Sequence, residues 1–104
     1  MSILSITFHT PQHLIQEWEN FQINSLEKMI ENFIQVEKYI LSDVQSDMIN
    51  EGKNTNLLLI FDDEDLRKEF VDSELENIKH HIEKEFEQDV MIFKTFLDQR
   101  KTRM

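Results

Sequence analysis

The spacing of apolar residues changes several times along the chain, and each change marks a predicted element. Residues 3–8 place every even-numbered apolar residue on one face, which predicts a strand. Thr10 and Pro11 then predict a helix start, because a hydroxyl can cap free amides and proline suits the first helical position. Asn24, followed three residues later by Glu27, fits a second N-cap, so this helix is expected to kink or restart near Ile23. Its apolar residues follow at steps of mostly three and four, namely Leu14, Trp18, Phe21, Ile23, Leu26, Met29 and Ile30.

The middle of the chain predicts a hairpin of two strands. From Phe33 the apolar period becomes two, which predicts a long strand, with room for a bulge, running to about Asp47. Residues 50–54 hold the only glycine and predict the hairpin turn. Residues 57–61 are apolar without alternation, as expected of a central strand covered on both faces.

The last third of the chain predicts a helix and a closing strand. Four acidic residues at 62–65 favour a helix N-terminus, where capping and the helix dipole both stabilise carboxylates. The closing strand covers residues 90–97. The order βαββαβ predicts a single α+β domain over residues 1–104, a ferredoxin-like sandwich of two helices on a four-stranded antiparallel sheet. A frayed tail is expected from about residue 99. The buried stripe of the second helix comprises Leu66, Phe70, Val71, Leu75, Ile78, Ile82 and Phe86.

The predicted sheet carries more large apolar residues than one covered face can bury. Helices cover one face, and the other should alternate to polar residues if it meets water. The closing strand instead places Val90, Ile92 and Phe96 on one face and Met91, Phe93 and Leu97 on the other. An apolar patch on a sheet is self-complementary through a two-fold axis. The sequence therefore predicts a homodimer joined through the outer sheet face, a dimeric α/β barrel.

Composition excludes several classes of partner and site. The 104 residues include 21 acidic and 11 basic side chains, a net charge of −10, and no cysteine. Such a chain is expected to bind neither nucleic acid nor anionic membranes, and it has no disulfide or thiolate metal site. No apolar run approaches the roughly 20 residues that cross a bilayer. The first residues lack the basic region of a signal peptide, so a cytoplasmic location is expected.

No set of residues predicts a catalytic centre, a cofactor site or a metal site. The sharp strand-to-helix turn that presents a nucleophilic serine in hydrolases needs more than one glycine. Gly52 is the only glycine in this sequence. His80 and His81 are adjacent on a helix, so their side chains diverge by about 100°. His13 and Glu17 are four residues apart and could face one ion, but the sequence offers no third ligand.

Four side chains are candidates for lining a ligand pocket between sheet and helices. They are His9 at the end of the first strand, His13 and Trp18 on the first helix, and Tyr39 on the second strand. Trp18 fits the helix core as well as it fits ligand stacking. The bulky residues throughout the chain predict that such a pocket is filled.

Three short stretches resemble a family of uncharacterised bacterial proteins catalogued as a domain of unknown function. These stretches are Phe86 followed by Val90, Phe93, Thr95 and Leu97; Glu17-Trp18 followed by Phe21; and Tyr39-Ile40-Leu41-Ser42. The family is similar to the dimeric α/β-barrel superfamily, and the resemblance implies a ferredoxin-like fold with the sheets of two chains paired. It implies no catalytic residue. Two positions depart from the family pattern, with Ile23-Asn24-Ser25 in place of a His-Ile-Pro break and Glu87 in place of a glycine.

Three functions remain open from the sequence. The first is a homodimeric structural or interaction module without catalysis, favoured because no catalytic set is present. The second is a dimer that binds an unidentified small molecule, and the third is a cofactor-independent enzyme of the monooxygenase or isomerase type.

Overall fold

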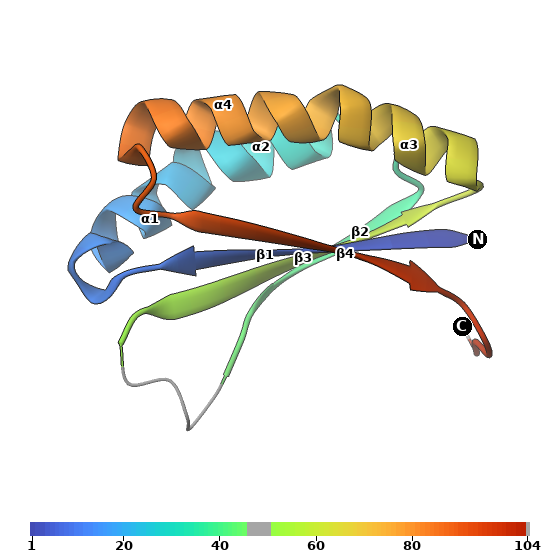
Figure 1. Cartoon of the computed structure of the whole chain (residues 1–104), viewed down its shortest axis with the longest axis horizontal. Coiled ribbons are helices and arrows are strands. Elements are labelled where there is room, and N and C mark those ends of the chain that lie inside the picture. The colour runs from blue at the N-terminus through green and yellow to red at the C-terminus, as the bar shows by residue number, and fades with distance from the viewer. Residues whose placement is uncertain (46–50, 104) are drawn as a thin grey trace.

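The helices that the structure describes lie on one face of a four-stranded antiparallel sheet (Figure 1). The computed structural model describes residues 1–45 and 51–103. The strands follow the order β2-β3-β1-β4 across the sheet, so the first and third strands of the chain are central. This arrangement confirms the predicted α+β ferredoxin-like sandwich. The strands are β1 (Ser2–Thr10), β2 (Lys38–Asp43), β3 (Lys53–Phe61) and β4 (Met91–Asp98).

The helical layer consists of two long segments, each built from consecutive helical elements. The first segment changes its hydrogen-bonding pattern but continues through η1 (Gln12–Leu14), α1 (Ile15–Phe21), a π-helical turn η2 (Gln22–Leu26) and α2 (Glu27–Glu31). The second is divided at Ser73 into α3 (Glu64–Asp72) and α4 (Glu74–Phe86). None of the helices in the described ranges is long and apolar enough to span a bilayer.

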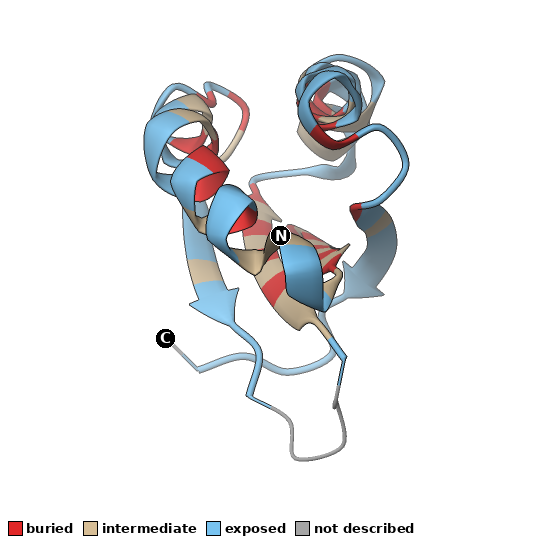
Figure 2. Cartoon of the chain, turned by 90° about the vertical axis from the view of Figure 1, so that its left-hand side faces the viewer, coloured by how far each residue is buried: buried red, intermediate tan, exposed pale blue. Residues whose placement is uncertain are grey.

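The core lies between the helices and the covered sheet face (Figure 2). Even-numbered residues of β1 and odd-numbered residues of β3 point inward, as the alternation predicts. Trp18 is the centre of one aromatic group, with its ring 5.3 Å from that of Phe8 and 5.5 Å from that of Phe21, measured between centroids. Phe33, Phe61 and Phe70 form a second group under the other end of the helices.

Of the two helix N-termini predicted from the sequence, one is confirmed and one is wrong. Asp63 caps α3, because its Oδ1 accepts a hydrogen bond of 2.9 Å from the amide of Leu66, as the acidic run predicted. The prediction for Thr10 and Pro11 is wrong. Thr10 is the last residue of β1, and its hydroxyl is buried facing inward without a hydrogen-bond partner in the described part of the chain. Pro11 occupies the N-cap position, so helical structure begins at Gln12.

Strand β2 is shorter than predicted. It begins at Lys38 rather than Phe33, because the ring of Phe33 leaves the sheet and packs edge-on against Phe70, 4.9 Å away between centroids. Ile34 is consequently 87% exposed. The predicted end at Asp47 lies outside the described residues.

Two turns depend on positive φ angles. Gly52 has a φ of 102°, and a Cβ there would lie 2.4 Å from the carbonyl oxygen of Thr10, so this position requires glycine. Glu87 has a φ of 56° and a ψ of −122°, and the amide of Asp89 bonds to the carbonyl of Phe86 across it. These angles are those of a type II′ turn at its first central residue, where glycine is favoured. Glu87 therefore holds the conformation that a glycine would adopt without strain.

We expect Glu87→Gly to raise the free energy of unfolding by about 1 kcal/mol, because relief of backbone strain outweighs the added freedom of the unfolded chain. Thermal unfolding followed by circular dichroism measures the change as a rise in Tm. Gln88→Gly, at a residue without positive φ, is the matched control and should lower Tm. A fall in Tm for Glu87→Gly would contradict the assignment.

Candidate functional site

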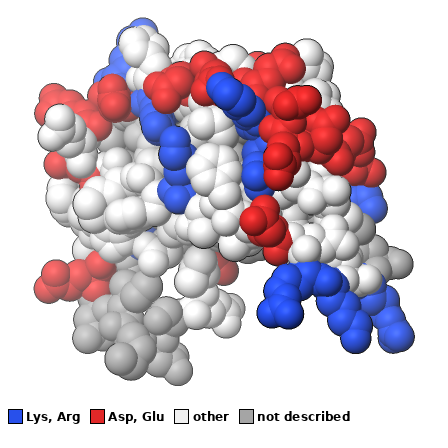
Figure 3. All heavy atoms as spheres, turned by 45° about the vertical axis from the view of Figure 1, so that its right-hand side comes forward, with Lys and Arg blue, Asp and Glu red and all other residues white. Residues whose placement is uncertain are grey.

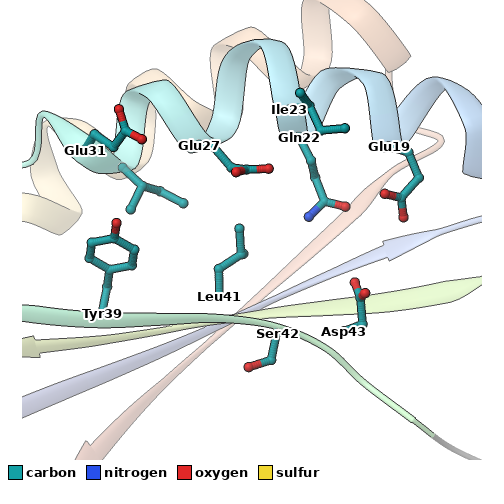
Figure 4. A pocket seen from close by; sticks show the side chains of 10 residues that line it. Glu19, Gln22, Ile23, Glu27, Glu31, Tyr39, Leu41, Ser42 and Asp43 are labelled. Carbon is teal, nitrogen blue, oxygen red and sulfur yellow. The ribbon is translucent and has the colours of Figure 1, made fainter.

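A groove with a volume of about 520 Å³ lies between the first helical segment and the edge strand β2 (Figure 4). We call it the acidic groove. The helical wall contributes Glu19, Gln22, Ile23, Glu27, Ile30 and Glu31, and the strand contributes Tyr39, Leu41, Ser42 and Asp43. The sequence predicted that bulky residues would fill any pocket between sheet and helices. This groove is open, so that prediction is wrong here. The inward side of β2 is covered less closely there than the inward sides of the two central strands.

The helical wall is acidic because of a four-residue repeat. Glu19, Ile23, Glu27 and Glu31 follow one another at steps of four, which places them along one side of the helical segment. Figure 4 shows these side chains extending from the helix toward the strand. Strand β2 adds a fourth carboxylate, Asp43, through its inward-facing positions.

The π-helical turn decides which residues of the first segment are buried. A regular α-helix returns to the same face after about seven and eleven residues. It would therefore place Ser25 and Met29 on the same buried face as Trp18. The extra residue in the turn instead brings Leu26 and Ile30 inward, and both are buried. Aliphatic residues thus fill the core where a hydroxyl would otherwise be placed.

The predicted stripe is wrong at two positions. Ile23 was predicted to be buried, but it lies five residues after Trp18, about 140° around the helix, and it is 60% exposed and lines the groove. Gln22 lies four residues after Trp18, about 40° around the helix, and is buried instead, with 6% of its surface exposed. The irregularity predicted near Ile23 is present as the π turn, but the helix does not restart there with Asn24 as its cap, because α2 continues directly from the turn.

Gln22 is a polar side chain in an apolar stripe. It lies four residues after Trp18 and four before Leu26, and its amide points toward the groove (Figure 4). Its Oε1 atom has no hydrogen-bond partner in the described residues. A buried amide oxygen without a partner costs roughly 1–3 kcal/mol, so this glutamine destabilises the isolated chain.

One end of the acidic groove is neutralised by a lysine. The Lys53 ammonium group bonds to Glu19 and lies 3.2 Å from Asp43 Oδ1. The hydrogen bond to Glu19 raises the pKa of Lys53 above its ordinary value of 10.5, and Asp43 adds to the shift while burial opposes it. This bridge joins the first helix to the hairpin.

The other end of the groove has no such cation. Glu31 lies above Tyr39 and Glu27, one turn away, lies above Leu41 (Figure 4), and neither forms an ion pair with any residue of the described ranges. Like charges at this spacing repel each other. The groove therefore has four carboxylates and one compensating ammonium group.

The four residues proposed from the sequence do not meet in one place. Tyr39 lines the acidic groove. Trp18 is fully buried in the core, where its Nε1 donates to Thr55 Oγ1 at 3.1 Å. His9 lies on the outer sheet face, 2.6 Å from Asn54 Oδ1, and His13 is exposed in η1. Within the described ranges, no three metal-binding side chains come together.

The sequence does contain a signal for the groove, which reasoning from apolar spacing missed. A glutamine four residues from a buried tryptophan and four from a buried leucine is unusual on a core-facing stripe. Glu19, Glu27 and Glu31 recur on the adjacent side of the same helix. Together they indicate that Gln22 lies next to an acidic surface.

Comparison with known families identifies the chain. Residues 1–100 match the model of a family described as a domain of unknown function, DUF4286. The chain belongs to this family. No curated protein matches it in sequence.

Solved structures of other proteins share the fold of this DUF4286 chain. An EthD-family protein from Bacillus halodurans is 10% identical with a TM-score of 0.69, covering 91% of this chain and 97% of that chain. HapK from Hahella chejuensis is 6% identical with a TM-score of 0.68, covering 100% and 97%. A dimeric ferredoxin-like protein from an uncultured marine organism is 12% identical with a TM-score of 0.66, covering 100% and 99%. At these identities the likeness shows the fold alone.

We expect Lys53→Met to lower the free energy of unfolding at pH 7 by on the order of 1 kcal/mol, because Glu19 and Asp43 lose their shared cation. A lysine whose pKa is raised by folding stabilises the protein below about pH 10.5 and loses that contribution at higher pH. The difference between wild type and variant should therefore fade as the pH rises past this value. Urea unfolding at pH 7 and pH 11.5 measures it.

Lys68→Met is the matched control, because Lys68 pairs with Asp72 at an exposed position on α3. Its effect at pH 7 should be smaller than that of Lys53→Met. An undiminished loss for Lys53→Met at pH 11.5 would contradict the assignment of this stability to the charge of Lys53.

Proposed function

We propose that this protein is a homodimeric interaction module in which two copies join through the outer faces of their sheets. The observation that supports the proposal is the apolar character of a sheet face that no helix covers (Figure 1). Met91, Phe93 and Leu97 of β4 point outward, and Phe93 is 53% exposed. Ile40 on the opposite edge strand is also exposed.

The apolar residues of the outer face lie in two adjacent rows at one end of the sheet and along the edge strand β4. In the first row, Ile3 of β1 lies between Ile60 of β3 and Leu97 of β4. Leu58 lies beside Ile40 in the next row. A patch of this kind on a soluble chain marks an interaction surface, and a second copy offers the same surface in return.

Several polar residues at the centre of the outer face are compatible with its burial. Asn56 Nδ2 donates to Ser5 Oγ at 2.9 Å and to Thr7 Oγ1 at 3.2 Å. His9 and Asn54 bond to each other near the end of the same strands. Because these groups already have partners within the sheet, a second sheet can cover them at little cost in lost hydrogen bonds to water.

The charge distribution also favours the sheet face over the helical face as the contact. Acidic side chains are concentrated over the helical layer at the top of Figure 3, where two copies would repel each other. The basic group at the lower edge of that view lies where Figure 1 places the C-terminus. One protein of the same fold is described as dimeric, which agrees with the proposal.

The proposed module needs no catalytic step and no cofactor. Ser42 points away from the acidic groove (Figure 4), so this groove has no serine beside a base. The remaining polar groups of the groove are carboxylates, an amide and the Tyr39 phenol. We propose that the dimer acts in the cytoplasm.

We expect Phe93→Lys to dissociate the dimer, because two buried ammonium groups would face each other or the apolar residues of the other sheet. Light scattering after size exclusion should give wild type twice the chain mass of 12.6 kDa and the variant the single mass. Ile34→Lys, at an exposed apolar residue away from the sheet, is the matched control and should stay dimeric. Wild type that is monomeric at 50 μM (about the usual working concentration) would overturn the proposal.

A further inference from the structure

The acidic groove carries an uncompensated charge next to an unsatisfied buried amide. Glu27 and Glu31 have no basic partner in the described residues, and Gln22 Oε1 has no hydrogen-bond donor there. Both features cost free energy in the isolated chain. Both costs would be offset by one kind of ligand, a cation that donates hydrogen bonds.

A π-helical turn lies between these two features. It begins at Gln22 and ends just before Glu27, and both side chains line the groove (Figure 4). Such turns occur within helices mostly as single insertions and frequently at functional sites. Here the insertion has a local consequence, because it allows Leu26 and Ile30 to follow Gln22 on the buried side.

The walls of the groove define the rest of the ligand. Ile23 and Leu41 present aliphatic surface from the two sides, and Tyr39 presents a half-exposed ring below Glu31 (Figure 4). An ammonium group near an aromatic face gains a cation–π attraction. Apolar walls between charged ends suit a ligand with a hydrocarbon body and cationic ends.

We propose that the acidic groove binds an organic diamine or a larger aliphatic polyamine. One ammonium group contacts Glu27 and Glu31 over the Tyr39 ring. The chain of methylene groups lies between Ile23 and Leu41, and a second amine donates to Gln22, whose terminal amide can rotate to present its oxygen. A bare metal ion fits less well, because no three metal-binding side chains converge in the described structure.

This inference is independent of the proposed dimer. The groove lies on the helical side of β2, whereas the dimer contact uses the outer face of the sheet. Loss of amine binding would leave the dimer proposal intact, and a monomeric protein could still bind the amine.

The first test is calorimetric titration with 1,5-diaminopentane at pH 7 and low salt. We expect a dissociation constant below about 1 mM, and no heat with 1,5-pentanediol, which has the same length without charge. The variant Glu27→Gln/Glu31→Gln should bind at least about tenfold more weakly. Glu83→Gln/Glu87→Gln, a pair with the same spacing at the end of α4, is the matched control and should bind like wild type.

The second test separates ligand binding from general attraction between an acidic protein and a cation. Gln22→Leu changes no charge, and it should raise Tm because it removes an unsatisfied amide from an apolar stripe. If Gln22 serves the ligand, the same variant should bind 1,5-diaminopentane several-fold more weakly. Circular dichroism confirms that each variant is folded.

Three results would overturn the inference. They are an absence of binding up to 10 mM amine (well beyond the ~1 mM expected), an equal loss of affinity in both double variants, and unchanged affinity in Gln22→Leu with a raised Tm. The last result would make Gln22 a structural defect of the helix and not part of a site.

Discussion

The structure depends on one imbalance in the burial of apolar surface. Helices cover a single face of the sheet, yet large aliphatic and aromatic residues occupy both of its faces. The covered face forms the core around Trp18 and Phe70, and the helices of the same chain bury it. The outer face is buried only if another surface covers it, because Phe93 and Ile40 are exposed in the described chain. The sheet-to-sheet dimer that we propose would bury it with the chain's own residues.

The same need for burial shapes the helical side. The first helical segment must bring Trp18, Leu26 and Ile30 onto one face of the sheet, and their spacing does not fit a regular α-helix. A π-helical turn accommodates the extra residue. The turn allows Leu26 and Ile30 to follow Gln22 on the buried side, so the core-facing stripe beside the groove includes a glutamine. Core packing and the candidate ligand site therefore meet at this part of the helix.

Most elements could be predicted because their apolar residues follow a strict period. Strand β1 and the cap at Asp63 are examples, since alternation and acidic capping act within a few residues. A break near Ile23 was predicted, but its π-helical form was not, because the shift that buries Leu26 and Ile30 depends on packing against the sheet. Phe33 looked like a strand residue for a similar reason. Its ring packs against Phe70, a residue 37 positions away along the chain, and alternation alone carries no information on such contacts.

Nuclear Overhauser effects between two copies test the central claim most directly. In a dimer mixed from isotope-labelled and unlabelled chains, filtered spectra detect only contacts across the interface. The account predicts effects from the methyl groups of Leu58, Ile60 and Leu97 of one copy to outer-face residues of the other. Effects that instead connect residues of the helical layer, or the absence of any effect between copies, would contradict it.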